Sequence, residues 1–342
     1  MKIVIVGKFY IEGFALHISE TLASMGHSAF QVDPGQKVLP MTGKLGHRIN
    51  QVLELMYQTS GGIPQLRAGR ARKLISQIAA LGPNLVIVCH DYLTPDEVYK
   101  IKKITGAAVV MWFPDSMANF GRAYFMNAPY DALFFKDPYL IRVLGGILKS
   151  PVHYLPECCN PLQHILRRED YAVYDKKYWE DIDIAIAGNQ HSWRVAYFSH
   201  LSEFNVKIWG NPAPLWMPNN GLKKMYQGYG VFNQEKAFIF NKAKINVNNL
   251  LYSEIEGVNA RCFEVAAASG FQLIDFRPSL SDIFILDKEL VTFSGMQDLK
   301  EKIAHWLPRH EERAEIAHAG HKKALARHTY KHRLEEMLSI IS

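Results

Sequence analysis

The amino-acid sequence predicts an α/β protein made of two domains, each with a parallel sheet covered by helices. Three observations lead to this prediction. At 342 residues the chain is longer than one ordinary domain. Short and almost wholly apolar runs, such as residues 2–6 and 182–187, are typical of strands in a parallel sheet that is buried on both faces. Residues 243–276 read as strand, helix and strand, which is a βαβ unit.

The N-terminal half repeats the strand pattern at intervals that suit helical connections. A helix is expected from Gly13 to Met25, and further strands are expected at residues 29–32, 84–89, 107–112, 131–135 and 151–155. The segment 155–161 contains two prolines and breaks the pattern, so it is typical of a linker. We therefore expect domains at residues 1–155 and 181–327, a linker at 156–180, and a final helix at 328–342.

Composition and charge restrict the class of function. The chain is 48% hydrophobic, 12% aromatic and 21% charged, which is typical of a globular protein. Its net charge of +6 suits an anionic small ligand or an acidic membrane surface. No block of Lys and Arg interleaved with aromatic residues occurs, so no nucleic-acid partner is expected.

The same features predict a cytoplasmic protein. Its four cysteines have no metal-type spacing and are interpreted as reduced thiols. The first residues predict a strand rather than a secretory signal, and no run of 18 apolar residues occurs that could span a membrane. Residues 39–72 are basic, which leaves two interpretations open: peripheral contact with the inner face of the membrane, or a helix pair with a solvated basic side.

Residues 253–270 carry the most informative pattern in the chain. Glu256 and Glu264 are separated by seven residues, and Gly257 lets the backbone approach a ligand closely. Asn259 stands near the start of the expected helix, where free N–H groups favour an anion. Arg261 lies three residues before Glu264, so both share one helix face. A guanidinium suits phosphate oxygens, and a carboxylate can accept sugar hydroxyls. The alternative is a solvated Arg–Glu pair.

A second segment repeats this arrangement. The apolar strand 182–187 is followed by Gly188, and Arg194 then enters the next helix. The strand 206–209 ends in Trp209 and is followed by Gly210. Nicotinamide and ATP fingerprints are absent, because the first glycines of the chain, Gly7 and Gly13, fit neither spacing.

These residues resemble a known group. The segment 253–270 is similar to the E-x7-E signature of retaining glycosyltransferases with the GT-B fold. Its Asn-x-Arg-x-Phe-Glu form, and the closing His-Thr-Tyr-x-x-Arg at 328–333, resemble the CgeB-like, spore-maturation-type branch. The resemblance implies two Rossmann-like domains that face each other across a cleft, with the C-terminal helix returning to the N-terminal domain.

The resemblance also implies a nucleoside-diphosphate sugar donor and no further cofactor. A UDP-sugar is expected first, with GDP- and dTDP-sugars as alternatives. Arg194 and Arg261 would contact the diphosphate, Glu264 the ribose, and Glu256 the donor sugar. The expected donor site consists of Gly188, Arg194, Trp209, Gly210, Tyr252, Gly257, Asn259, Arg261 and Glu264. For Trp209, plain core packing is the alternative.

Polar residues that follow two N-terminal strands are candidates for the acceptor side. His90 and Asp91 follow the strand at 84–89, and Asp115 follows the strand at 107–112. Side chains just past the carboxyl ends of parallel strands face the ligand crevice. Each could orient an acceptor hydroxyl or take its proton. The alternative is helix capping or turn formation, especially for the two aspartates.

The expected function is transfer of a sugar to an acceptor hydroxyl, with retention and without a metal. No Asp-x-Asp stands in the cleft loops, because Asp181 and Asp183 open a strand. Inversion stays open, with an N-terminal carboxylate or His90 as the base. The acceptor, whether glycan, lipid, protein or small molecule, also stays open. The alternative functions are a sugar-nucleotide epimerase or hydrolase on the same fold, and a non-catalytic protein that binds nucleotide sugars.

Overall fold

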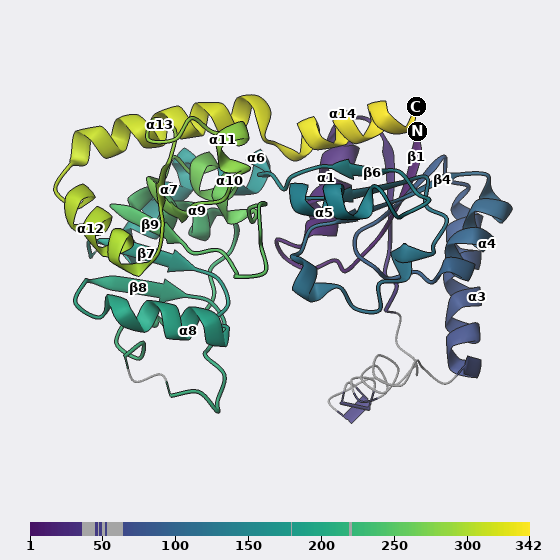
Figure 1. Cartoon of the computed structure of the whole chain (residues 1–342), viewed down its shortest axis with the longest axis horizontal. Helices are drawn as coiled ribbons and strands as arrows, with labels where there is room; N and C mark the ends of the chain where they lie inside the picture. The colour runs from purple at the N-terminus through teal and green to yellow at the C-terminus, as the bar shows by residue number, and fades with distance from the viewer. Residues whose placement is uncertain (36–44, 47, 50–51, 53–63, 179, 219–220) are drawn as a thin grey trace.

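The structure is a computed structural model, and it describes residues 1–35, 45–46, 48–49, 52, 64–178, 180–218 and 221–342. The chain forms two lobes, each with its own parallel sheet and surrounding helices (Figure 1). The predicted α/β class is confirmed. Most of the basic segment 39–72, with both interpretations given for it, lies outside the described residues.

The N-terminal lobe contains a six-stranded parallel sheet with the order β2-β1-β3-β4-β5-β6. Its strands are β1 (Lys2–Val6), β2 (Ser28–Val32), β3 (Leu85–Val88), β4 (Ala108–Phe113), β5 (Ala132–Phe135) and β6 (Val152–Tyr154). Its helices and single turns are α1 (Phe14–Ser24), α3 (Pro64–Leu81), α4 (Pro95–Thr105), η1 (Met117–Asn119), η2 (Tyr124–Met126) and α5 (Pro138–Leu144). Every residue of β3 and β5 is buried, as expected for a sheet covered on both faces.

The C-terminal lobe contains a five-stranded parallel sheet with the order β11-β10-β9-β7-β8. Its strands are β7 (Ile184–Ala187), β8 (Val206–Trp209), β9 (Ile245–Asn248), β10 (Gln272–Asp275) and β11 (Val291–Phe293). Its helices and single turn are α8 (Ser192–Phe198), η3 (Ser199–Leu201), α9 (Asn233–Lys242), α10 (Arg261–Ala267), α11 (Leu280–Ile283), α12 (Met296–Trp306) and α13 (His310–Arg327). In both sheets the carboxyl ends of the strands share one edge, and the loops at these edges form the site described below.

The end of α10 differs from the sequence expectation. The sequence suggests Gly270 as the residue that ends this helix. In the structure Ser269 takes the left-handed conformation, with φ 57°. Gly270 is needed for another reason: a Cβ atom there would lie 2.5 Å from the carbonyl oxygen of Phe240. The glycine therefore allows close packing of α10 against α9 rather than a turn.

The chain passes between the lobes twice, and the two crossings lie side by side. The first leads through α6 (Pro161–His164) and α7 (Arg168–Lys177), and the second leads into α14 (Tyr330–Ile341). The backbone N–H of Cys159 donates to the carbonyl of His328 at 3.0 Å, and the N–H of Tyr330 donates to the carbonyl of Cys159 at 3.0 Å. Each crossing therefore supports the other.

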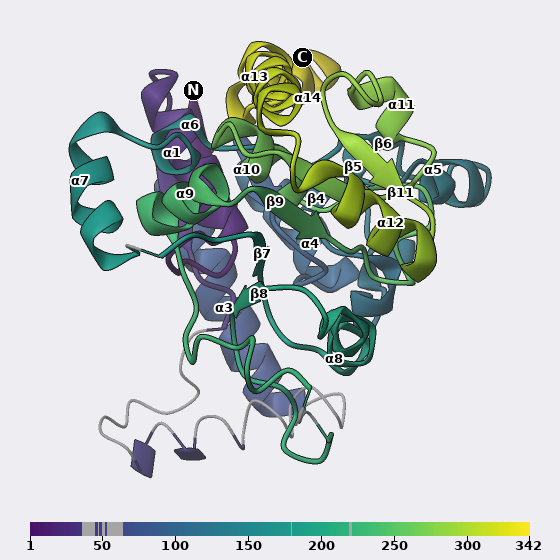
Figure 2. The ribbon, with the colours of Figure 1, turned by 90° about the vertical axis from the view of Figure 1, so that its left-hand side faces the viewer.

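Helix α14 packs on the N-terminal lobe, as predicted. Its Leu334 and Met337 belong to the same buried cluster as Ile18 and Leu22 of α1. Viewed from the side of the second lobe, α13 and α14 lie together at the top of the molecule (Figure 2). Within the described part of the chain, no helix has both the length and the apolar character needed to cross a bilayer.

Candidate functional site

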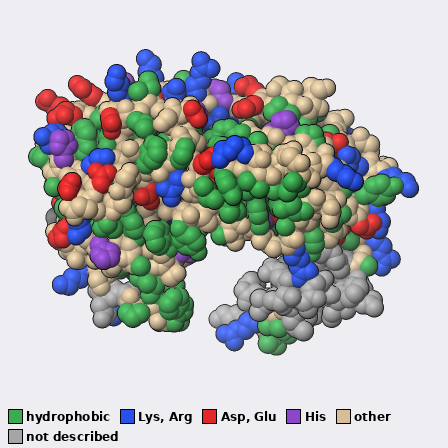
Figure 3. All heavy atoms as spheres, viewed as in Figure 1, with side chains coloured by type: hydrophobic (Ala, Val, Ile, Leu, Met, Phe, Trp, Pro, Cys, Tyr) green, Lys and Arg blue, Asp and Glu red, His purple; other side chains and the backbone are tan. Residues whose placement is uncertain are grey.

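A cavity of about 620 Å³ lies between the lobes. The loops after β1, β4, β5 and β6 line it from one side, and the loops after β7, β8 and β9 line it from the other. The space-filling view shows the deep notch that separates the lobes on one side of the molecule (Figure 3). Such a cleft between two lobes, at the carboxyl edges of their sheets, is the usual place for a ligand in open α/β folds.

Arg194 and Arg261 meet in this cavity. Arg194 is only 5% exposed, and its Nε donates to Oδ1 of Asn249 at 3.1 Å. Nη1 of Arg261 donates to Oδ1 of Asn248 at 3.0 Å. Asn248 is the last residue of β9 and Asn249 follows it, so the end of one strand positions both guanidinium groups. A side chain at Gly188 would overlap Nη1 of Arg194 and Nη2 of Arg261, so both groups lie over the backbone of that glycine.

Two glycines that the sequence analysis selected make this arrangement possible. Gly188 has φ +125° and Gly210 has φ +150°, a region that side-chain-bearing residues rarely adopt. A side chain at Gly210 would also overlap the carbonyl of Gly188. Both glycines line the cavity, as does Asn259, which exchanges amide hydrogen bonds of 3.1 Å with Asn248.

The charge of the two guanidinium groups is only partly offset: Glu264, Glu254 and Glu157 raise the pKa of Arg261, although burial outweighs them. Among the residues that the structure describes, no carboxylate lies within ion-pair distance of Arg194 or Arg261. Burial lowers the pKa of Arg194, and the neighbouring Arg261 lowers it further. Burial also lowers the pKa of Arg261. This end of the cavity is therefore built to receive a negative charge.

Glu264 forms a group with Lys236 and Glu12. Nζ of Lys236 lies 2.7 Å from Oε2 of Glu12 and 2.9 Å from Oε2 of Glu264. Burial raises the pKa of Glu264, but Lys236 and His164 outweigh it, so the pKa falls to about 2. Glu264 is therefore ionised, and its second oxygen, Oε1, lies 3.8 Å from Nε2 of His164 and accepts no hydrogen bond from the described residues.

A second buried lysine connects the two lobes. Nζ of Lys136, just after β5, lies 2.7 Å from Oε1 of Glu254 and 3.8 Å from Oε2 of Glu157. Burial raises the pKa of Glu157 to about 8. The positive charge of Lys136 lowers this pKa, but the negative charges of Asp115 and Glu254 raise it again. Near neutral pH this carboxyl group is therefore mostly protonated.

The structure separates the three acceptor-side candidates. Asp115 lines the cavity, and its Oδ2 lies 3.6 Å from Nε2 of His90. Asp91 instead accepts hydrogen bonds from the backbone N–H groups of Tyr124 and Phe125, at 2.8 and 3.0 Å. This is the turn-forming role that the sequence left as an alternative. Asp91 faces a separate cavity of about 460 Å³.

Glu256 and Gly257 lie away from the position that the sequence suggested. The carboxylate of Glu256 pairs with Arg142 of the other lobe, at 2.5 and 2.7 Å. A Cβ atom at Gly257 would lie 2.6 Å from the carbonyl oxygen of Lys136. The close approach at this glycine is therefore to the other lobe and not to a ligand. Glu254, two residues earlier, is the glutamate of this loop that lines the cavity.

The aromatic candidates also lie differently. Trp209 is 1% exposed and belongs to the core of the C-terminal lobe, which is the alternative given for it. Tyr252 is 69% exposed and lies outside the cavity lining, with its ring 5.8 Å from that of Trp193. Trp193 itself lines the cavity. The sequence could have indicated Trp193, because it stands next to Arg194 in the segment that follows β7 and Gly188.

Several charged residues of the site were missed. They are Glu12, Lys136, Glu157, Lys236 and Glu254. Lys136 follows β5 directly, so the strand-end rule that selected His90 and Asp115 would also have found it. The other four lie on loops or a helix far apart in the sequence, and their spacing carries no signal.

Solved structures with the same architecture cover the whole chain. Sucrose-phosphate synthase from Thermosynechococcus elongatus is 10% identical with a TM-score of 0.68, and the match covers 99% of this chain and 98% of that one. HepE from Anabaena, solved with UDP-glucose, is 10% identical with a TM-score of 0.68 and 99% of both chains covered. AviGT4, a glycosyltransferase involved in avilamycin A biosynthesis, is 13% identical with a TM-score of 0.60. At such identities the likeness shows the fold, which is GT-B.

Sequence comparisons then indicate the family. Residues 189–339 match the family described as glycosyl transferase-like. Spore protein CgeB of Bacillus subtilis (strain 168) is 29% identical over 118 residues, a match that spans 34% of this chain and 34% of that protein. The whole chain therefore has the GT-B fold, its residues 189–339 are glycosyl transferase-like in sequence, and about a third of it is similar to CgeB, the branch that the sequence predicted.

Proposed function

We propose that the protein transfers a sugar from a nucleoside-diphosphate sugar to an acceptor hydroxyl. The observation that carries this proposal is the pair of guanidinium groups of Arg194 and Arg261 over the backbone of Gly188. Removing a cation from water costs several kcal/mol, and two neighbouring cations also repel each other. A diphosphate supplies the missing negative charge and accepts paired N–H donors.

An unpartnered amide supports this assignment. Asn249 is 3% exposed and lines the cavity, and its Nδ2 has no hydrogen-bond partner in the described structure. Its Oδ1 is already engaged by Arg194, so the amide N–H groups are the free part. Buried polar groups are nearly always paired in native proteins, and a donor phosphate or ribose oxygen would complete this one.

The same groups suit the chemistry of transfer. Negative charge grows on the diphosphate as its bond to the sugar breaks, and Arg194 and Arg261 are already aimed at that region. We propose that the two lobes, residues 1–155 and 181–327, close around the donor and exclude water. The paired crossings at Cys159 and His328 form the natural hinge for this movement.

We further propose a UDP-sugar as the donor. HepE, a GT-B neighbour, was solved with UDP-glucose and with UDP. Glu264 is assigned to the ribose, because it is ionised, lines the cavity and has one oxygen without a close hydrogen-bond donor. Trp193 and His191 line the cavity beside Arg194 and are assigned to the base.

We also propose that transfer proceeds with retention and without a metal. The two guanidinium groups supply the charge that a divalent cation supplies in other transferases. A leaving phosphate held next to the acceptor can itself take the hydroxyl proton. Nuclear magnetic resonance of the product, recorded with and without EDTA in the reaction, checks both points: an inverted anomeric carbon or loss of turnover in EDTA would contradict them.

Isothermal titration calorimetry with UDP, GDP and dTDP tests the donor site. We expect UDP to bind the wild type, and Arg261→Ala to lose both affinity and turnover. Arg168→Ala, which removes an exposed arginine of α7, is the matched control. Undiminished UDP affinity in Arg261→Ala would remove the assignment. Incubation with donor alone distinguishes the other enzymatic function, since rapid epimer or free-sugar formation would indicate an epimerase or hydrolase.

A further inference from the structure

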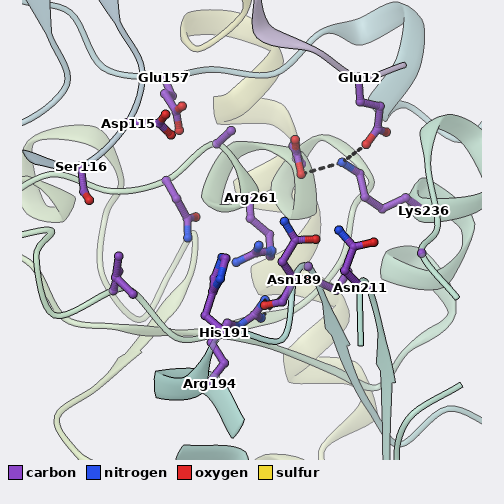
Figure 4. Close-up of a pocket in the computed structure, with 18 of the residues that line it drawn as sticks. Glu12, Asp115, Ser116, Glu157, Asn189, His191, Arg194, Asn211, Lys236 and Arg261 are labelled. Carbon is purple, nitrogen blue, oxygen red and sulfur yellow. Dashed lines mark hydrogen bonds and ion pairs between the residues drawn. The ribbon is translucent and has the colours of Figure 1, made fainter. Parts of the chain in front are cut away.

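The cavity between the lobes has opposite charge at its two ends. Arg194 and Arg261 form the positive end, on the C-terminal lobe. Asp115 and Glu157 stand across the cavity, on the N-terminal side (Figure 4). The donor diphosphate proposed above occupies the positive end, so the acidic end is the part left for the acceptor.

The acidic end holds more carboxylates than cations. Lys236 is shared by two carboxyl groups, those of Glu12 and Glu264, at 2.7 and 2.9 Å, and burial raises the pKa of Glu12. Asp115 is a third carboxyl group at this end: burial raises its pKa, but the nearby His90 and the charge of Lys136 outweigh this and lower it. Oδ2 of Asp115 lies 3.6 Å from Nε2 of His90.

Glu157 completes this end as a neutral group. Nζ of Lys136 pairs with Oε1 of Glu254 at 2.7 Å, so the charge of this lysine is already balanced and Glu157 has no cation of its own in the group of Lys136, Glu157 and Glu254. Burial raises its pKa to about 8. A protonated carboxyl group both donates and accepts a hydrogen bond, which suits a hydroxyl group.

A smaller cavity of about 330 Å³ continues from this end. It shares Asp115, Glu157 and Glu264 with the main cavity. Its wall includes the rings of Tyr10, Tyr92 and Tyr330. This volume admits one sugar ring, and a wall that combines carboxyl groups with aromatic residues suits the hydroxyl groups and C–H faces of a sugar.

One buried histidine in the wall of the smaller cavity has a ring nitrogen without a partner in the described structure. His17 lines this cavity and is 3% exposed, and its Nε2 lacks a hydrogen bond in the described structure. Its Nδ1 already lies 2.9 Å from Nδ2 of Asn160. Burial lowers the pKa of His17 to about 4, so the ring is neutral at neutral pH and does not offset the acidic side chains.

We propose that the acceptor is an uncharged, hydroxyl-rich group, such as a sugar ring, which enters the smaller cavity beside Asp115 and Glu157. This inference rests on the proposed function, because it takes the arginine end as the donor site. A phosphate or carboxylate on the entering ring would be repelled by the ionised carboxylates of Asp115 and Glu264, which line the same cavity. At an effective dielectric constant of about 20, such repulsion weakens binding by about tenfold or more.

The test uses wild-type protein saturated with UDP and ligand-detected nuclear magnetic resonance. The probes are glucose, galactose and mannose, each compared with its uronic acid, which has the same ring and one added carboxylate. We expect at least one neutral hexose to bind, and its uronic acid to bind at least about tenfold more weakly. In the double variant Asp115→Asn/Glu157→Gln the difference should fall to about threefold or less. Asp96→Asn, an exposed carboxylate of α4, is the control and should leave the preference unchanged.

Each outcome bears on one proposal. Equal or tighter binding of the uronic acids to the wild type would overturn the acceptor class, and so would failure of all three hexoses to bind the UDP-loaded protein. An unchanged preference in a folded double variant would remove Asp115 and Glu157 from the site. Failure of UDP and the other nucleotides to bind would instead count against the proposed function.

Discussion

Replacing Arg261 with methionine separates binding from stability. In the free protein Arg261 makes a hydrogen bond of 3.0 Å to Asn248, but its buried charge faces that of Arg194 with no carboxylate in ion-pair distance among the described residues. Methionine keeps much of the side-chain volume and removes the repulsion. The free variant is therefore expected to melt at the same temperature as the wild type or higher.

Binding should change in the opposite direction. A guanidinium that holds a diphosphate through two charge-assisted hydrogen bonds contributes at least about 1.5 kcal/mol for each bond. The loss of about 3 kcal/mol corresponds to an affinity for UDP about 100-fold weaker. Because a ligand that binds only the folded state raises its melting temperature, the stabilisation that UDP gives should shrink as well.

Thermal denaturation with and without UDP, together with calorimetric titration, measures both effects. Lys136→Met is the contrasting variant, because Lys136 is also buried but lies between Glu254 and Glu157. Removing one partner of a buried ion pair costs about 3–5 kcal/mol, so this variant should be strongly destabilised. The reasoning is refuted if Arg261→Met is destabilised as much as Lys136→Met, or if it binds UDP like the wild type.

Three further predictions follow from particular side chains. Glu256→Gln should leave the affinity for the UDP-sugar within about twofold, because Glu256 pairs with Arg142. Glu264→Gln should lower that affinity by about tenfold, the worth of roughly one charged hydrogen bond. A larger loss of affinity in Glu256→Gln than in Glu264→Gln, measured by calorimetry, would return Glu256 to the donor site. The pKa of Glu157 is about 8 in the folded protein and about 4.5 in the unfolded chain, so between these pH values only the folded protein keeps the carboxyl proton. The free energy of unfolding should therefore fall as pH rises from about 4.5 to about 8. Urea denaturation of Glu157→Gln should lack this component, and an identical pH slope would contradict it. The pKa values of His17 and His164 fall to about 4 and 3 from an ordinary 6.5, so stability should also decline as pH drops from about 6.5 towards 3. In His17→Leu/His164→Leu this acid-side decline should be smaller, and an unaltered decline would assign it elsewhere.

The fold was predictable because its strands are short, apolar and spaced by helices. A strand buried on both faces, such as β3 or β7, needs an apolar side chain at every position, and this leaves a strong signal in the sequence. The site was predictable where a residue follows such a strand directly. Gly188 and Asp115 are of this kind, and Arg194 lies in the helix that follows the same strand as Gly188; all three line the cavity.

The remaining part of the site depends on how the lobes meet. The sequence assigns Glu256 to the donor because of its spacing from Glu264, but docking of its loop turns Glu256 toward Arg142 and Glu254 toward Lys136. Two residues along an extended loop decide which carboxylate faces the cavity. The partners come from the other lobe, more than a hundred residues away, so no local pattern records them.

A crystal structure of the protein with bound UDP tests the central claim most directly. The account predicts that diphosphate oxygens lie within hydrogen-bond distance of both Arg194 and Arg261, above Gly188, with Glu264 on the ribose. A complex in which the diphosphate lies elsewhere, with the two guanidinium groups still unpaired, would contradict it.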